Sequence, residues 1–101
     1  MNDQELARQI VAHLGGDGPN NYAAYSIVID GIAHWMPAEK LVNDWCVAGA
    51  MMELVGVCCK WDKHKHGYTV TVIPHDIEAR NESLPRAINE ACVLKLDGES
   101  Q

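Results

Sequence analysis

The segment from Pro37 to Val55 carries the longest helical pattern in the chain and restricts the fold more than any other feature. Pro37 suits the first turn of a helix, and Gly56 is a typical helix terminator. Apolar residues step by four, three, four and three, which draws one continuous stripe. The stripe contains Leu41, Trp45, Ala48, Met52 and Val55, and it is widened by Val42, Cys46 and Met51. We predict one helix over residues 37–55, the most buried of the fold. Gly49 lies inside it at a cost of about 1 kcal/mol relative to Ala, so we expect a close approach of another backbone there.

Two further helices are predicted from residues that are typical of helix ends. Asn2 is a suitable cap for a helix over residues 3–14, which the Gly15-Gly16 pair would end. Ser83 is a suitable cap for a helix over residues 84–96, which a following Asp-Gly pair would end. Both segments carry apolar residues at helical spacing, so each helix should bury one face.

Short β-branched segments between the helices predict strands and hairpins. Residues 25–29 form one strand, and Asp30-Gly31 offers a two-residue hairpin turn before a short second arm. Residues 57–61 and 68–73 form a second hairpin, joined by a charged connection of six residues. Alternation of apolar and polar residues in the second arm is typical of a half-buried antiparallel strand. Residues 77–79 extend this sheet along an edge, after a proline that breaks the strand.

The order of elements predicts an α+β fold in one domain over residues 1–101. We expect a single antiparallel sheet of three to four strands sandwiched between helices, in α-β-α layers. A chain of 101 residues has room for one core. Because the chain has no Phe, three Trp, three Tyr, four Met and four Cys must fill that core.

The charge balance bears on partners and compartment. Eight basic and 14 acidic residues give a formal net charge of −6, which disfavours direct binding to nucleic acid or to an anionic membrane. A host protein or complex with a basic surface is the partner expected from this charge, although solubility alone also accounts for it. No apolar run approaches the roughly 20 residues of a membrane span, and no signal segment is visible at the start. We therefore expect the host cell cytoplasm, with the cysteines reduced: Cys46, Cys58, Cys59 and Cys92.

Three segments support a family resemblance. The first is the helix with Asn43-Asp44-Trp45 and Ala48–Glu53, the second leads from Trp61 into Gly67-Tyr68-Thr69-Val70, and the third runs from Ala79 through Asn81-Glu82-Ser83-Leu84-Pro85 to Ala87-Ile88, Ala91 and Leu94. Together they resemble the phage ABA-sandwich domain, a family of small phage and prophage proteins, over roughly residues 37–96. The resemblance implies one sheet between helical layers and a phage or prophage origin. It supplies no catalytic residues and no cofactor.

Cysteine and histidine residues near the second hairpin suggest a weak alternative of metal binding. Cys59, His64 and His66 are the candidates, with Cys58 and His75 nearby in sequence. Thiolate and imidazole are preferred ligands of zinc. Adjacent cysteines in a strand face opposite sides, however, and no paired metal-ligand spacing is present. We therefore predict no metal site. We interpret these residues instead as two core cysteines beside a solvated turn.

Two charged groups of residues are candidates for ligand or partner binding. The only basic cluster of the chain is suited to a phosphate, although a hairpin tip is ordinarily polar. Its candidate residues are Lys60, Lys63, Lys65 and His66. The candidate acidic residues for a basic partner are Glu39, Asp44, Asp76 and Glu78. The aromatic residues Tyr22, Tyr25 and Trp35 either mark an interface or fill the core.

No catalytic signature is recognisable, and we expect neither an enzyme nor a cofactor. The leading hypothesis is a phage-type accessory protein that acts by binding, for instance an anti-CRISPR-like inhibitor of a host defence complex. The alternatives are a homo-oligomeric protein that sequesters a nucleotide or another small molecule, and a phage structural or interaction domain.

Overall fold

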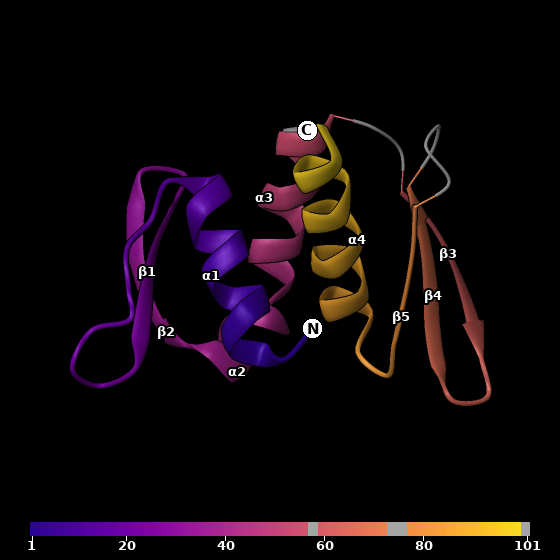
Figure 1. Cartoon of the computed structure of the whole chain (residues 1–101), viewed down its shortest axis with the longest axis horizontal. Helices are drawn as coiled ribbons and strands as arrows, with labels where there is room; N and C mark the ends of the chain where they lie inside the picture. The colour runs from indigo at the N-terminus through magenta and orange to yellow at the C-terminus, as the bar shows by residue number, and fades with distance from the viewer. Residues whose placement is uncertain (57–58, 73–76, 100–101) are drawn as a thin grey trace.

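Helices lie between two small antiparallel sheets in the computed structural model (Figure 1). The structure describes residues 1–56, 59–72 and 77–99, with the backbone only for residue 99. The first sheet pairs β1 with β2, and the second has the order β3-β4-β5. The elements are α1 (Asp3–Leu14), β1 (Ala24–Ile29), β2 (Ile32–Pro37), α2 (Ala38–Val42), α3 (Trp45–Val55), β3 (Cys59–His64), β4 (Gly67–Val72), β5 (Ile77–Asn81) and α4 (Leu84–Glu99).

The predicted α+β class with antiparallel strands is confirmed, but the strands form two sheets instead of one. The helices therefore occupy the middle of the molecule, and a sheet covers them on each side (Figure 1). Each sheet buries one face in the core that it shares with the helices. Tyr25 and Ile27 enter from β1, and Val70 and Val72 enter from β4; all four are fully buried. The layers thus run β-α-β, the reverse of the expected α-β-α order.

The first hairpin forms at the predicted turn. Asp30 and Gly31 have φ angles of 53° and 78°, as a two-residue turn with both central residues left-handed requires. Ile29 is paired with Ile32 directly beside the turn. The second arm continues to Pro37, so the hairpin is longer than the sequence indicated.

The single helix predicted over residues 37–55 is wrong, because the chain breaks it at Asn43 and Asp44. Asn43 ends α2, and its side chain donates to the carbonyl oxygen of Glu39 at 2.8 Å. The carboxylate of Asp44 accepts from the backbone N–H groups of Cys46 at 2.8 Å and Val47 at 3.1 Å, which caps the start of α3. Local hydrogen bonding by these short polar side chains competes with a continuous helix.

The break changes which residues of the predicted stripe are buried. Leu41, Val42, Val47, Ala48 and Met51 lie in the core. By contrast, the first residue of α3, a tryptophan at position 45, is 60% exposed, whereas a continuous stripe would bury it. The close approach expected at the helical glycine, position 49, is also absent, since no described neighbour lies within 4 Å of a Cβ built there.

The second hairpin is longer at its tip than predicted. The strand placed at residues 57–61 is described from Cys59 and continues to His64, so only Lys65 and His66 form the turn in place of the six-residue connection. Residues 57–58 and 73 of the predicted hairpin lie outside the described residues. The edge extension at residues 77–79 is a full third strand, β5, in which Ala79 pairs with Val70 of β4.

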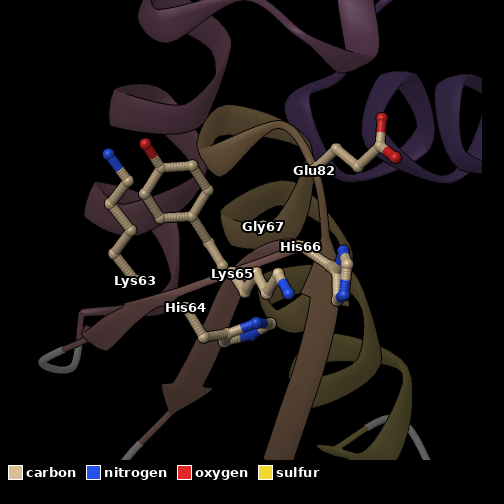
Figure 2. Close-up of a pocket in the computed structure, with 7 residues that line it drawn as sticks. Lys63, His64, Lys65, His66, Gly67 and Glu82 are labelled. Carbon is tan, nitrogen blue, oxygen red and sulfur yellow. The ribbon is translucent and has the colours of Figure 1, made fainter.

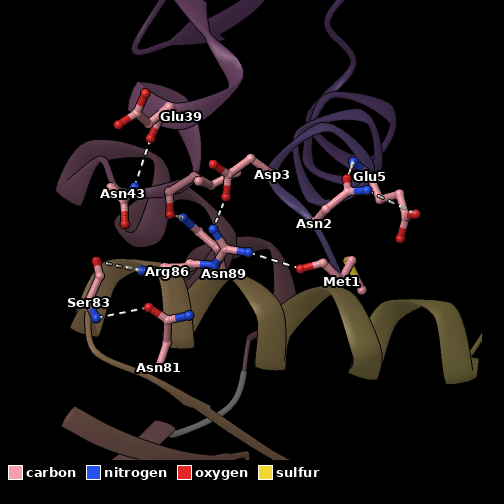
Figure 3. Close-up of polar contacts among 11 residues, drawn as sticks. Met1, Asn2, Asp3, Glu5, Glu39, Asn43, Asn81, Ser83, Arg86 and Asn89 are labelled. Carbon is pink, nitrogen blue, oxygen red and sulfur yellow. Dashed lines mark hydrogen bonds and ion pairs between the residues drawn. The ribbon is translucent and has the colours of Figure 1, made fainter. Parts of the chain in front are cut away.

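The final helix begins as predicted and ends later. The Ser83 hydroxyl accepts from the backbone N–H of Arg86 at 3.4 Å, consistent with an N-cap. The helix runs past the predicted end at residue 96 to Glu99. Asp97, in the last turns of α4, contacts His13 of α1, with 2.9 Å between Oδ1 and Nε2. Arg86 joins the other end of α4 to the chain start, through an ion pair with Asp3 and a bond to the Met1 carbonyl oxygen (Figure 3).

Within the part of the chain that the structure describes, no helix combines the length and the apolar character needed to cross a bilayer.

Candidate binding sites

A basic pocket lies at the tip of the β3–β4 hairpin (Figure 2). It has a volume of about 410 Å³ and is open to solvent. We call it the basic tip; it is lined by Lys63, His64, Lys65, His66, Gly67, Tyr68 and Glu82. The lining thus combines two ammonium groups and two imidazoles with one carboxylate, a set of groups suited to an anion that also carries a hydrogen-bond donor.

Gly67 allows two segments that are distant in sequence to meet at the basic tip. Its φ angle is 139°, and a Cβ at this position would lie 2.5 Å from the carbonyl oxygen of Asn81 and 2.8 Å from the Cα of Glu82. Only glycine fits there without movement of the backbone. This close approach brings the β5–α4 connection, with its glutamate, against the hairpin. His64 is held in turn by a 2.9 Å hydrogen bond between its Nε2 and the hydroxyl of Thr69.

The structure gathers three of the four residues predicted to bind phosphate. Lys63, Lys65 and His66 line the basic tip, but Lys60 does not. Lys60 pairs with Thr71 further along the sheet, where it is exposed. The glutamate at position 82 was not anticipated, because its proximity depends on the fold and no local pattern reports it.

The weak candidates for a metal site are not brought together. Cys59 pairs with Val72 at one end of β3, and His64 pairs with Gly67 at the other end. Five residues of strand separate the two by about 16 Å, so they cannot share one ion with His66. Among residues 1–56, 59–72 and 77–99 no cluster of three metal-ligating side chains occurs. The two remaining candidates, at positions 58 and 75, lie outside the described residues.

Cys59 instead interacts with a cysteine of α4. The thiol of Cys92, which is fully buried, donates a hydrogen bond to Cys59 and lowers the pKa of Cys59 to about 7, although partial burial acts in the opposite direction. The hydrogen bond to Cys59 and the burial of the Cys92 thiol both raise the pKa of Cys92. Cys59 is therefore the member of the pair that carries a thiolate near neutral pH.

A second candidate site lies between the first hairpin and α3. Two adjacent hollows of about 290 and 200 Å³ share Ile29 and Cys46 in their lining. We call them together the hairpin groove; it is lined by Ile29, Asp30, His34, Trp35, Met36, Lys40, Asp44, Cys46, Gly49, Ala50 and Glu53. Its lining is mainly apolar, with three carboxylates and one lysine among the charged groups.

Large apolar side chains are exposed around the hairpin groove. Trp35 of β2 is 56% exposed, and Trp45 adjoins the groove residues Asp44 and Cys46 in the chain. Val28 and Ile32 of the same hairpin are also exposed. By the strand register, Trp35 and Val28 share one face of the hairpin, whereas Ile32 lies on the other face. Exposed apolar groups that share a face are typical of an interface. Of the three aromatic residues singled out in the sequence, Trp35 thus lies at this surface.

The other two aromatic residues have different positions. Tyr25 is fully buried, and its hydroxyl donates to the side-chain oxygen of Gln4 at 3.0 Å. Tyr22 is 88% exposed in the segment before β1. Tyr25 therefore fills the core, as the absence of Phe suggested, while Tyr22 contacts solvent.

The four acidic residues predicted for partner binding do not form one surface. Glu39 is exposed on α2, and Asp44 lines the hairpin groove while its carboxylate caps α3. Glu78 lies on β5, in the other sheet, where it contacts Arg80 at 3.3 Å. Asp76 lies outside the described residues. The groove brings in two carboxylates that sequence reasoning did not select, those at positions 30 and 53.

Comparison with known proteins identifies a related fold. No protein-family model and no curated protein matches the chain. A solved structure does: a phage protein from Bacillus cereus ATCC 14579, whose crystal structure was determined at 2.0 Å. The match has a TM-score of 0.64 and 20% sequence identity, and it covers 96% of this chain and 89% of that one. The two proteins share the α+β fold along nearly the whole chain.

Proposed function

We propose that this protein is a non-enzymatic phage accessory protein that binds a basic protein surface through the hairpin groove. The observation that carries the proposal is the combination of one exposed tryptophan with carboxylates at one groove. Trp35 lies in that groove together with Asp30 and Glu53. Aromatic anchors surrounded by polar groups are typical of the central residues of protein interfaces.

Charge determines the kind of partner. Residues 1–56, which build the hairpin groove, contain seven acidic residues and only two basic ones. A surface of this sign attracts a partner with clustered lysine and arginine and accelerates the encounter at low ionic strength. It also repels phosphate backbones, so the partner is a protein and not the nucleic acid itself.

The exposed apolar groups supply the short-range part of the binding energy. Trp35 and Trp45 are both more than half exposed in the free protein. Burying the exposed part of one tryptophan side chain contributes on the order of 2 kcal/mol. Trp35, with Val28 on the same face of the hairpin, would stabilise a specific complex even where the charges are screened by salt.

A phage origin is part of the proposal. It is supported by the fold shared with the Bacillus cereus phage protein and by the resemblance to the phage ABA-sandwich family. A small protein with a net charge of −6 is complementary in charge to the basic nucleic-acid groove of a host complex. We therefore propose a host-defence complex as the target, which the protein would inhibit in an anti-CRISPR-like manner. The alternative is a phage structural or interaction domain, which would also act by binding another protein.

Matched tryptophan variants test the proposal. Tagged wild-type protein would be incubated with host lysate beside Trp35→Ala, Glu53→Lys and the control Trp61→Ala, and the bound proteins compared by mass spectrometry. Trp61 is a suitable control because it is 52% exposed on β3, in the other sheet. We expect one basic partner that is retained by the wild type and Trp61→Ala and is lost with the two groove variants. The proposal would be contradicted if Trp35→Ala and Glu53→Lys still captured the partner, or if only Trp61→Ala lost it.

A further inference from the structure

The basic tip is separate from the hairpin groove, since the two sites belong to different sheets. We propose that the basic tip binds the phosphate group of a small phosphate monoester that also carries hydroxyl groups, such as a sugar phosphate or a nucleoside monophosphate. This inference does not rest on the proposed binding of a basic protein. It concerns a second site of opposite charge on the same molecule.

The nitrogen-bearing side chains of the tip come from both faces of the hairpin. Neighbouring residues of a strand point to opposite sides, so Lys63 and His64 approach the turn from different directions. Lys65 and His66 form the turn itself. Figure 2 shows the nitrogen-bearing ends of His64, Lys65 and His66 gathered at the tip. Ammonium and imidazole groups in this arrangement donate hydrogen bonds to several oxygens of one phosphate.

Glu82 determines the class of phosphate compound. Glu82 lines the same pocket, and its negative charge disfavours a bare phosphate ion there. A ligand with hydroxyl groups next to its phosphate can donate to this carboxylate while the phosphate contacts His64, Lys65 and His66, whose nitrogen-bearing ends lie together in Figure 2. The site therefore favours a phosphate monoester with a polyhydroxyl part over inorganic phosphate.

Hydrogen bonds and close packing hold the backbone around the tip. The side chain of Asn81 accepts from the backbone N–H of Ser83 at 2.9 Å, which fixes the connection that carries Glu82. The glycine at position 67 packs against this connection, and Thr69 holds the ring of His64. A preformed turn reduces the conformational entropy that is lost on binding. Because the pocket is open to solvent, we expect millimolar affinity.

A titration followed by amide NMR tests the inference on the full chain. Adenosine monophosphate, inorganic phosphate and adenosine would be added separately at millimolar concentrations. We expect adenosine monophosphate to shift the amide resonances of residues 63–67, inorganic phosphate to shift them at higher concentration, and adenosine to leave them unchanged. No shift with either phosphate compound, or equal shifts with adenosine, would overturn the inference.

Variants separate a built site from a general positive charge. Lys65→Ala combined with His66→Ala should weaken the binding of adenosine monophosphate about tenfold. Lys60→Ala is the control, because it removes one lysine charge from β3 of the same hairpin, outside the pocket, and it should change the affinity less than about twofold. Glu82→Gln should abolish the preference for adenosine monophosphate over inorganic phosphate. An equal loss in Lys60→Ala, or an unchanged preference in Glu82→Gln, would contradict the proposed site.

Discussion

The side-chain nitrogen of Asn89 donates a hydrogen bond of 3.1 Å to the carbonyl oxygen of Val42, inside the core (Figure 3). Asn89 is a fully buried polar residue of α4, and Val42 is the last residue of α2. The carbonyl groups at a helix end lack partners within their own helix. Asn89 thus supplies a donor where the chain turns from α2 into α3, and it connects two elements that are 47 residues apart in sequence.

Removing this donor should destabilise the fold. Asn89→Leu leaves the carbonyl oxygen of Val42 buried without this partner, so we expect the free energy of unfolding to fall by about 1–3 kcal/mol. Urea denaturation measures the change. Asn43→Ala is a useful comparison, because its bond to Glu39 lies at an exposed position. An Asn89→Leu variant as stable as the wild type would show that the bond contributes little.

The cap of α3 gives a second test. Asp44→Ala removes the acceptor of two backbone N–H groups, and we expect a loss of about 1 kcal/mol in the free energy of unfolding. Glu39→Ala removes an exposed carboxylate of α2 and should change stability by less than about 0.5 kcal/mol. Equal thermal denaturation midpoints for the two variants would argue against the capping role of Asp44.

Two glycines should respond to alanine in opposite ways. Gly67→Ala introduces a Cβ against the backbone of Asn81 at a φ of 139°, so a loss of at least about 1–3 kcal/mol is expected. Gly49→Ala places a methyl group in open space within α3 and should stabilise the protein by about 0.5–1 kcal/mol. The free energies from urea titration decide the point: a neutral Gly67→Ala or a destabilising Gly49→Ala would contradict the geometry described.

The cysteine pair predicts a pH-dependent reactivity. Because the pKa of Cys59 is lowered to about 7, its thiolate fraction and its rate of alkylation should rise as the pH passes through 7 and then level off. Cys92→Ala removes the donated hydrogen bond and should move this midpoint to higher pH. Iodoacetamide labelling resolved by peptide mass spectrometry measures both. An identical midpoint in the wild type and Cys92→Ala would exclude the role of Cys92.

Much of the secondary structure follows from local chemistry. The Asp30-Gly31 turn and the cap at Ser83 were predictable, because each is set by backbone preferences and hydrogen bonds within a few residues. The break at Asn43 and Asp44 was missed, although both residues favour helix ends, since the apolar stripe around them was continuous. The division into two sheets could not be deduced, because it depends on which faces the helices cover.

The candidate sites, like the fold, could be predicted from the sequence only in part. Lys63, Lys65 and His66 were selected from sequence because they are neighbours in the chain. Their carboxylate partner in the basic tip, Glu82, enters only through packing against Gly67. The hairpin groove has no local pattern at all, since its lining comes from two strands and their turn and from two helices. Trp35 and Asp44 are the lining residues that the sequence already offered as candidates for an interface.

Fluorine NMR of the protein labelled with 5-fluorotryptophan tests the proposed interface most directly. The chain has three tryptophans, so each can be assigned by substitution. Trp35 reports on the hairpin groove, Trp45 reports on the start of α3 next to the groove residues Asp44 and Cys46, and Trp61 reports on the other sheet. On addition of the captured partner, we predict that the signals of Trp35 and Trp45 shift or broaden while that of Trp61 stays unchanged. A change at Trp61 with Trp35 and Trp45 unaffected would contradict the account.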